Sequence, residues 1–140
     1  MEAWAGPLEA TIELQEVWRY LGYRFPATPS GRVEAHLEAA RPLALPLLEP
    51  RGAFRLVDQS CASGTGLPAP SGQVAVGLCT IGPRLEQECA SRLTVGETLL
   101  ALLLDGIGSA ATEAAADSLN ALVCNEAHRR GLSTEPRESP

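Results

Sequence analysis

The sequence predicts an α+β fold, in which a long Ala/Leu-rich helix packs on a small, mainly antiparallel sheet and two further helices lie near the N-terminus. Three observations lead to this class: two periodic segments early in the chain, two short strand-like runs in its middle, and one long periodic stretch after them. A length of 140 residues, with 45% hydrophobic and 20% charged side chains, suits a single domain over residues 1–140.

The two N-terminal helices are expected over residues 9–20 and 32–40. In the first, apolar side chains recur close to the helical period, and Gly22 stands where a helix would end. Ser30 is the expected N-cap of the second helix, because its hydroxyl can accept a hydrogen bond from a free backbone N–H. Pro42 is expected to disturb or end that helix, since proline removes a helical hydrogen bond.

Two strands are expected over residues 52–58 and 73–81. The first alternates apolar and charged side chains, which is typical of a half-exposed strand. The second is a short, nearly continuous apolar run, which is typical of a strand buried on both faces. Residues 59–72, between them, are dense in Gly, Pro and Ser and predict a loop. Pro83 is then expected to open a helix that runs to about Arg92.

Residues 94–130 form the longest periodic stretch and predict one helix rich in Ala and Leu. Gly131 is its expected stop, and a polar tail follows. Gly106 and Gly108 would each weaken an exposed helix by about 1 kcal/mol relative to Ala. We therefore expect the middle of this helix to be buried, with a close contact at these small residues.

Charge and residue usage exclude several function classes. The formal net charge of −6 opposes binding to nucleic acid or to an anionic membrane. Lys and Arg together number 11, and every one of them is arginine. Schiff-base and P-loop chemistry both need a lysine amine, and so both are excluded.

The sequence also indicates a compartment. The four cysteines form no C-x-x-C pair, and residues 1–16 contain acidic side chains and no apolar signal core. The longest fully apolar run lies at residues 99–104, far short of the roughly 20 residues that a membrane-spanning helix needs. We therefore expect a cytoplasmic chain with reduced thiols and no transmembrane segment.

Two patterns with a known chemical use have a simpler explanation. Gly106, Gly108 and Ala111 satisfy the G-x-G-x-x-A pattern of a dinucleotide-binding turn, but the residues before them have helical composition. Tight helix packing is the favoured interpretation. Cys124 and His128 lie four residues apart and could face one metal ion, but a second pair of ligands is missing from the sequence.

Two further patterns involve candidate catalytic groups. Asp105, Glu113 and Asp117 recur at intervals of eight and four, which favours a solvent-facing stripe over an acid/base pair. Ser63 precedes the glycine-rich residues 64–66 and would serve a small hydrolase or transferase, but the G-x-S-x-G elbow is missing.

Several segments, in this order, resemble the activation domain of cobalamin-dependent methionine synthase and its stand-alone relatives. The early helix ending in Y-L-G-Y at 20–23 looks like the family's opening, and C-T-I-G-P at 79–83 is similar to its T-x-G-P turn. L-L-D-G-I-G-S-A-A-T-E-A-A-A-D at 103–117 is similar to the family's long Ala/Gly helix. P-R-E-S-P at 136–140 matches the beginning of its R-x-x-x-G-Y signature, so the resemblance spans nearly the whole chain.

The resemblance implies a domain that presents S-adenosylmethionine to a corrinoid whose cobalt has become inactive Co(II), so that reduction and methyl transfer reactivate it. The partner would be a cobalamin-binding protein or a cobalamin-dependent methyltransferase, and this chain would be at most an accessory domain. In that family the signature arginine helps to hold the carboxylate of the methyl donor, a role that suits a guanidinium group. The residues implied as cofactor-binding are Arg137, Ser139 and Pro140.

The chain departs from the family where it stops at Pro140, before the Gly-Tyr pair of the signature. We therefore expect either the front portion of a longer domain or a reduced relative that kept the fold and lost the methyl-donor site. In the second case the chain would be a non-catalytic interaction or assembly module, and two copies would form a homodimer. The apolar helix face expected to pair them consists of Leu99, Leu103, Ile107, Ala110 and Ala114.

Overall fold

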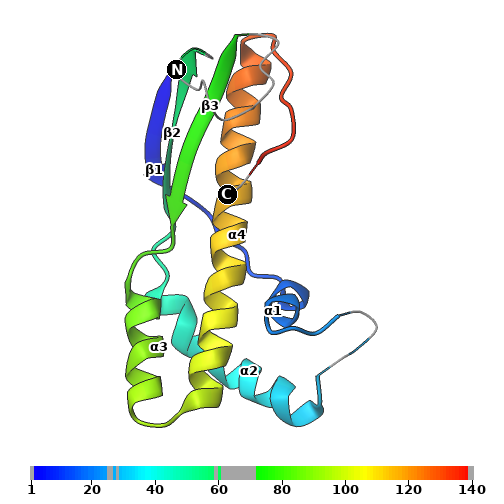
Figure 1. Cartoon of the computed structure of the whole chain (residues 1–140), viewed down its shortest axis with the longest axis vertical. Coiled ribbons are helices and arrows are strands. Elements are labelled where there is room, and N and C mark those ends of the chain that lie inside the picture. The colour runs from blue at the N-terminus through cyan, green and yellow to red at the C-terminus, as the bar shows by residue number, and fades with distance from the viewer. Residues whose placement is uncertain (1, 25–26, 28, 59, 61–71, 139–140) are drawn as a thin grey trace.

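The computed structural model describes residues 2–24, 27, 29–58, 60 and 72–138, and it confirms the α+β class. A long C-terminal helix, α4, packs on one face of a three-stranded antiparallel sheet (Figure 1). The elements in chain order are β1 (Ala3–Pro7), α1 (Leu14–Tyr20), α2 (Gly31–Ala44), the 3-10 turn η1 (Leu45–Leu47), β2 (Arg51–Asp58), β3 (Gln73–Thr80), α3 (Arg84–Thr94) and α4 (Thr98–Arg129).

The sheet has the strand order β1-β2-β3, and glycines allow α4 to approach it closely. Trp4, Phe54 and Gly77 are paired across the three strands, and the ring of Phe54 is buried between the sheet and α4. A Cβ atom at Gly77 would lie 3.0 Å from Cδ2 of Leu119, a residue of α4. A Cβ at Gly52 would lie 3.3 Å from Cδ1 of Leu119 on α4, and 2.6 Å from Cδ1 of Leu8 in the segment after β1. A larger side chain at either position would require the side chain of Leu8 or Leu119 to shift.

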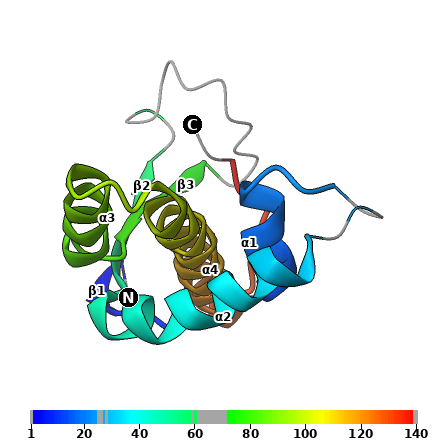
Figure 2. The same cartoon turned by 90° about the horizontal axis from the view of Figure 1, so that it is seen from below.

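The other three helices gather around the N-terminal half of α4 (Figures 1 and 2). Their shared core contains the largest fully buried side chains, and the predicted burial of the middle of α4 is confirmed. The expected close contacts at its glycines are also present. A Cβ at Gly106 would lie 2.9 Å from Cδ2 of Leu21, and one at Gly108 would lie 3.1 Å from Cδ2 of Leu85. The fully buried side chains are Val17, Leu37, Leu85, Leu103, Leu104 and Ile107.

The N-terminal segment differs from its prediction. The sequence indicated no strand before the first helix, yet β1 is the edge strand that pairs with β2. The first helix was expected from residue 9 but begins at Leu14. Tertiary hydrogen bonds explain the delay: Leu8 N–H donates to the Pro50 carbonyl at 2.9 Å, and the Ser118 hydroxyl donates to the Glu9 carbonyl at 2.6 Å. These bonds hold the linker extended.

Two helix boundaries also differ. Ser30 caps α2 as predicted, accepting from Val33 N–H at 3.4 Å, but the helix continues past Pro42 to Ala44. Ala40 and Ala44 are fully buried in the helical core, and this packing offsets the hydrogen bond that proline removes. The helix predicted over 94–130 is one continuous helix, but it begins at Thr98, because a turn in which Gly96 has a φ of +82° separates it from α3. Glycine reaches this conformation without strain, so the turn ends α3 sharply.

The strand β3 lies where it was predicted, but it is not buried on both faces. Most of its side chains are exposed, because it is the edge strand opposite β1 and α4 covers only one face of the sheet. The apolar side chains of β3 therefore form part of the protein surface.

The prediction that one apolar face of the long helix pairs two copies needs a correction. Leu103, Ile107 and Ala110 are buried within the chain itself, whereas Leu99 is exposed.

By length and composition, α4 is the one helix among the described residues that could cross a membrane. Half of its most apolar window is buried against the other elements. A helix at the centre of a packed core needs the same apolar composition. The absence of a membrane segment and the cytoplasmic location stay predictions.

Candidate functional site

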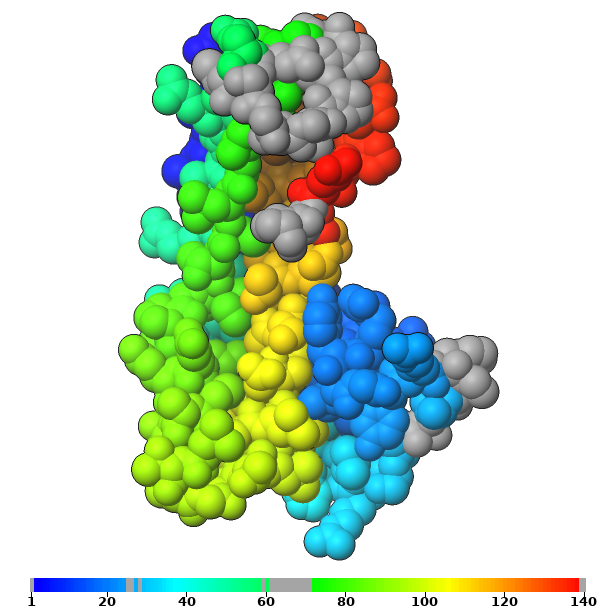
Figure 3. Space-filling model, viewed as in Figure 1, coloured from blue at the N-terminus to red at the C-terminus, as the bar shows by residue number. Residues whose placement is uncertain are grey.

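The C-terminal segment turns back along α4. Gly131 has a φ of +71°, and the backbone N–H of Leu132 donates to the Ala127 carbonyl at 2.9 Å, which reverses the chain at the end of the helix. Thr134 Oγ1 lies 3.3 Å from Cys124 Sγ, within hydrogen-bond distance. In Figure 3 this segment, in red, lies against the surface of α4. The predicted stop at Gly131 is confirmed, and the tail is brought back toward the middle of the helix.

Arg137 meets two carboxylates of α4 at the end of this return path. Its Nη2 donates a short hydrogen bond to Glu113 Oε1 and lies 3.3 Å from Asp117 Oδ1. Glu113 and Asp117 are four residues apart, so they occupy the same face of the helix, one turn from each other. The guanidinium is therefore held by side chains of a rigid element, although it belongs to an irregular segment.

One end of the Arg137 guanidinium has no hydrogen-bond partner among the described residues. The side chain is 26% exposed, but its Nη1 atom is buried and forms no hydrogen bond within the described part of the chain. A buried donor without an acceptor costs about 1–3 kcal/mol, and most such donors in folded proteins are satisfied. The Nη1 atom is thus a buried donor that the described residues leave without an acceptor.

Cys79, at the end of β3, lies within the electrostatic reach of this cluster. Burial raises the pKa of its thiol, the positive charge of Arg137 opposes that rise, and the charge of Glu113 adds to it. The raised pKa keeps the thiol protonated at neutral pH. Cys79 is therefore a neutral group near the cluster and not an anionic nucleophile.

The turn after Cys79 has a defined geometry. Gly82 has a φ of +80°, and its backbone N–H donates to Thr80 Oγ1 at 3.0 Å. Pro83 follows as the N-cap residue of α3, which confirms the predicted turn from strand to helix. The Ile81 carbonyl accepts from Glu49 N–H at 2.8 Å, which fixes the turn against the segment that precedes β2.

The structure brings some of the site residues predicted from the sequence together and leaves others apart. Arg137 meets Glu113 and Asp117, whereas the third acidic residue of the stripe, Asp105, lies away from them. Burial raises the pKa of the Cys89 thiol on α3, and the charge of Asp105 raises it further. The interpretation of the carboxylates as a solvent-facing stripe is confirmed for Glu113 and Asp117, whose side chains are 42% and 71% exposed, but it missed the ion pairs that both make with Arg137. Ser139 and Pro140 lie outside the described residues.

The other candidate patterns form no site in the described part of the chain. Gly106 and Gly108 lie inside α4, so the G-x-G-x-x-A pattern is a packing feature and not a turn. His128 is exposed, and the described residues contain no cluster of three metal-ligating side chains. Ser63 and residues 64–66 lie outside the described residues.

Sequence reasoning identified Arg137 but not its partners. The available signal was the four-residue spacing of Glu113 and Asp117, which places two like charges side by side and predicts a cation between them. The comparisons with known proteins add nothing to this geometry, since no protein-family model and no curated protein matches the chain.

Proposed function

We propose that this cluster binds the amino-acid end of S-adenosylmethionine, and that the chain supports reductive methylation and reactivation of a corrinoid on a cobalamin-binding partner or methyltransferase. The observation that carries the proposal is the buried, unpaired Nη1 of Arg137 beside two carboxylates. A guanidinium is the side chain best suited to bind a carboxylate, and it is held here before any ligand arrives.

The charges of the cluster complement those of the ligand. S-adenosylmethionine carries one carboxylate, one ammonium group and one sulfonium group. The cluster offers one guanidinium and two carboxylates, so each ligand charge has an opposite partner within the cluster. Arg137 would hold the ligand carboxylate through Nη1, and the solvent-facing oxygens of Glu113 and Asp117 would attract the two cations.

The protein's part in the reaction is to bind and to orient. The bound methyl donor supplies an electrophilic methyl group, and the corrinoid on the partner supplies the metal chemistry. Glu113 and Asp117 fix the guanidinium on α4, so that the ligand does not have to order a free tail. The protonated Cys79 thiol near the cluster adds no competing nucleophile.

Calorimetric titration of the full chain with S-adenosylmethionine tests the proposal. We expect a dissociation constant in the micromolar to submillimolar range, weakened by roughly 10- to 100-fold in Arg137→Ala, since a charge-assisted hydrogen bond contributes about 1.5–3 kcal/mol. Arg92→Ala is the matched control, because Arg92 also binds two carboxylates, Glu88 and Glu97, at the far end of the molecule. No heat, and no competition by the ligand at about 1 mM, would exclude the proposed function.

The alternative function is a non-catalytic module in which Arg137 only ties the C-terminal segment to α4. The two ion pairs favour it, since Nη2 is already satisfied within the chain. S-adenosylhomocysteine separates the two, because it has the carboxylate and ammonium groups but no sulfonium charge. The proposed function predicts measurable but weaker binding of S-adenosylhomocysteine, whereas the alternative predicts that neither compound binds.

A further inference from the structure

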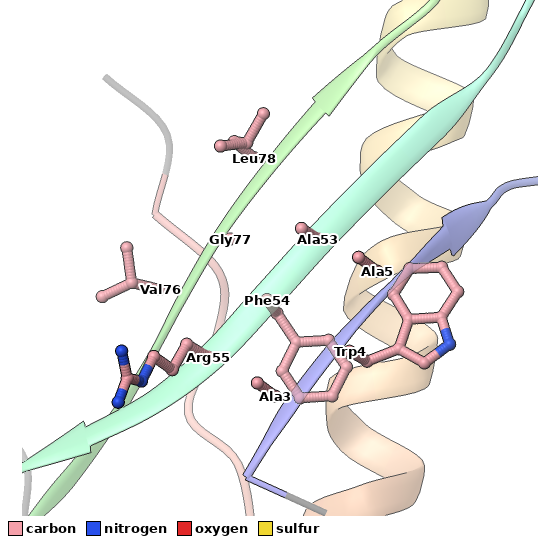
Figure 4. Close-up of a pocket in the computed structure, with 9 residues that line it drawn as sticks. All are labelled: Ala3, Trp4, Ala5, Ala53, Phe54, Arg55, Val76, Gly77 and Leu78. Atoms are coloured by element: carbon pink, nitrogen blue, oxygen red, sulfur yellow. The ribbon is translucent and has the colours of Figure 1, made fainter.

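The face of the sheet opposite α4 is apolar and open. Small side chains of β1 and β2 line its floor, and two larger side chains of β3 stand above them, forming a shallow groove of about 500 Å³ (Figure 4). Val76 is 55% exposed and Leu78 is 69% exposed. Exposed aliphatic side chains on adjacent positions of one strand face are typical of a surface that another element covers. The apolar residues of this open face in Figure 4 are Ala3, Ala5, Ala53, Val76 and Leu78.

The charges of the open face are opposite to those of the whole chain. Arg51 and Arg55 alternate with Ala53 along the central strand β2, so all three share the face that points away from α4. Both arginines are exposed, and neither forms an ion pair with a described residue. The positions paired with them are Pro7, Thr80, Ala3 and Val76, none of which is acidic. This surface is therefore cationic on a chain of net charge −6.

The positive charge of the open face favours some binding partners over others. A second copy placed face to face would bring two pairs of arginines together with no carboxylate between them, and such like charges oppose docking. Nucleic acid and anionic membranes are repelled by the remainder of the chain. A protein segment that joins apolar side chains to carboxylates meets both requirements of the face.

We propose that the open face of the sheet, with Arg51 and Arg55, is a docking surface for an amphipathic, acidic helix of a partner protein. The alanines at Ala3, Ala5 and Ala53 would let the helix backbone approach the sheet, while Val76 and Leu78 contact its apolar side. The two arginines are four residues apart on a strand, or about 13 Å. Carboxylates seven to eight residues apart on a helix, about 11–12 Å, match this distance.

A synthetic peptide tests the proposal on the full chain. The probe is a fluorescein-labelled helical peptide of about 18 residues, with leucines on one face and two glutamates about seven residues apart beside them. The matched peptides carry glutamine or lysine in place of the two glutamates. Fluorescence anisotropy should give a dissociation constant of tens of micromolar for the glutamate peptide and binding roughly 10-fold weaker for the glutamine peptide.

Variants of the chain give the decisive comparison. Arg51→Glu with Arg55→Glu should reverse the preference, so that the lysine peptide binds better than the glutamate peptide. Arg51→Gln with Arg55→Gln should abolish the preference, and it keeps the test valid if the charge reversal disturbs folding. Arg32→Glu is the control, because Arg32 is an exposed arginine of α2, a helix that packs on α4 and lies apart from the sheet in Figure 1. It should leave all three affinities within about 2-fold of the parent chain.

Four results would overturn the proposal. Equal affinity for the glutamate and glutamine peptides would show that the arginines play no part, and no binding at about 1 mM peptide would show that the face takes no helix. Dimerisation of the chain that Leu78→Asp abolishes would make a second copy the occupant. Sedimentation with phosphatidylglycerol vesicles that Arg55→Glu abolishes would make a lipid surface the occupant.

Discussion

The two halves of α4 lie in different surroundings. Its N-terminal half is enclosed by α1, α2 and α3, and its neighbours there are large, fully buried aliphatic side chains (Figure 2). Its C-terminal half has the sheet on one side and the returning C-terminal segment on another (Figure 1). The core of this second half is smaller and is built around Leu8, Phe54, Ala115 and Leu119.

The difference indicates a division of roles along one helix. The helical half contains the apolar burial from which most folding free energy comes. The sheet half contains the charged cluster at Arg137, the open sheet face and the buried carboxylate of Glu126. Polar groups and exposed apolar surface reduce stability, and both proposed binding sites lie in the half with less burial. Because both halves share α4, each depends on the other.

Removing side chains from the two cores should have the largest effect. Leu104→Ala, in the helical half, is expected to lower the free energy of unfolding by about 3–5 kcal/mol, because Leu104 is fully buried among large neighbours. Leu119→Ala, in the sheet half, should cost about 2–3 kcal/mol, because Leu119 packs against Gly52 and Gly77 in a smaller core. Urea denaturation measures both.

Each half contains one tryptophan, which allows the two halves to be followed separately. Trp4 stacks on Phe54 in the sheet half, and Trp18 packs on Tyr23 in the helical half. In the Trp4→Phe and Trp18→Phe variants, the fluorescence of the remaining tryptophan reports unfolding of one half. Both variants should give the same urea midpoint of unfolding, because α4 couples the halves in a single transition. Two separate midpoints in the parent chain would contradict this coupling.

Sequence patterns predicted the helical half better than the sheet half, for a physical reason. Helical periodicity, caps and stops are local, so Ser30, Gly22 and Gly131 located their helix ends correctly. Strand pairing and burial depend on partners far along the chain. Nothing local distinguishes an edge strand with one open face, such as β3, from a buried one. The strand β1 was missed for the same reason.

The candidate site, too, could be predicted from the sequence only in part. Arg137 could be singled out from its motif, and Glu113 and Asp117 from their spacing. That the three meet depends on the reversal at Gly131 and on how far the tail returns along α4, which is tertiary information. The buried state of the Arg137 Nη1 atom could not be predicted from the sequence, because it depends on the packing of all these segments.

Lowering the pH should destabilise the sheet half through one buried carboxylate, an effect smaller than that of the core substitutions. Glu126 is the buried charged residue of the described chain, and hydrogen bonds to its carboxylate, that from Arg130 among them, together with the charge of Arg129, lower its pKa from the ordinary 4.5 to about 2. A carboxyl group whose pKa is lowered by folding stabilises the folded state fully above about pH 4.5, and this contribution is lost as the pH falls toward 2.

Glu126→Gln should therefore melt below the parent chain at pH 6, and the difference in Tm should shrink steadily between pH 4.5 and pH 2. Glu38→Gln is the control, because Glu38 is an exposed carboxylate in the middle of α2 without an ion pair to a described residue. Its Tm should follow that of the parent at every pH. If the difference in Tm between Glu126→Gln and the parent chain does not change with pH, the loss of stability comes from the lost contacts and not from the lost charge.

The smallest effect on global stability is expected from two arginines that each join two carboxylates. Arg92 binds Glu88 at 2.6 Å and Glu97 at 2.8 Å across the turn between α3 and α4, while Arg137 joins Glu113 and Asp117 in the sheet half. These pairs are partly exposed, so Arg92→Ala and Arg137→Ala should each cost less than about 1 kcal/mol in the free energy of unfolding.

Hydrogen exchange should nevertheless separate these two variants. In Arg137→Ala, amides of residues 132–138 should exchange roughly 10-fold faster while those of α4 are unchanged, because the arginine ties an irregular segment to a rigid helix. In Arg92→Ala, the turn at Gly96 is backed by its own backbone hydrogen bonds, so any increase should be confined to residues 94–98. If Arg137→Ala also increased exchange throughout the C-terminal half of α4, the tail would be part of the core of that half. The ion pair would then stabilise the whole sheet half, and it could not be treated as a local anchor for a binding site.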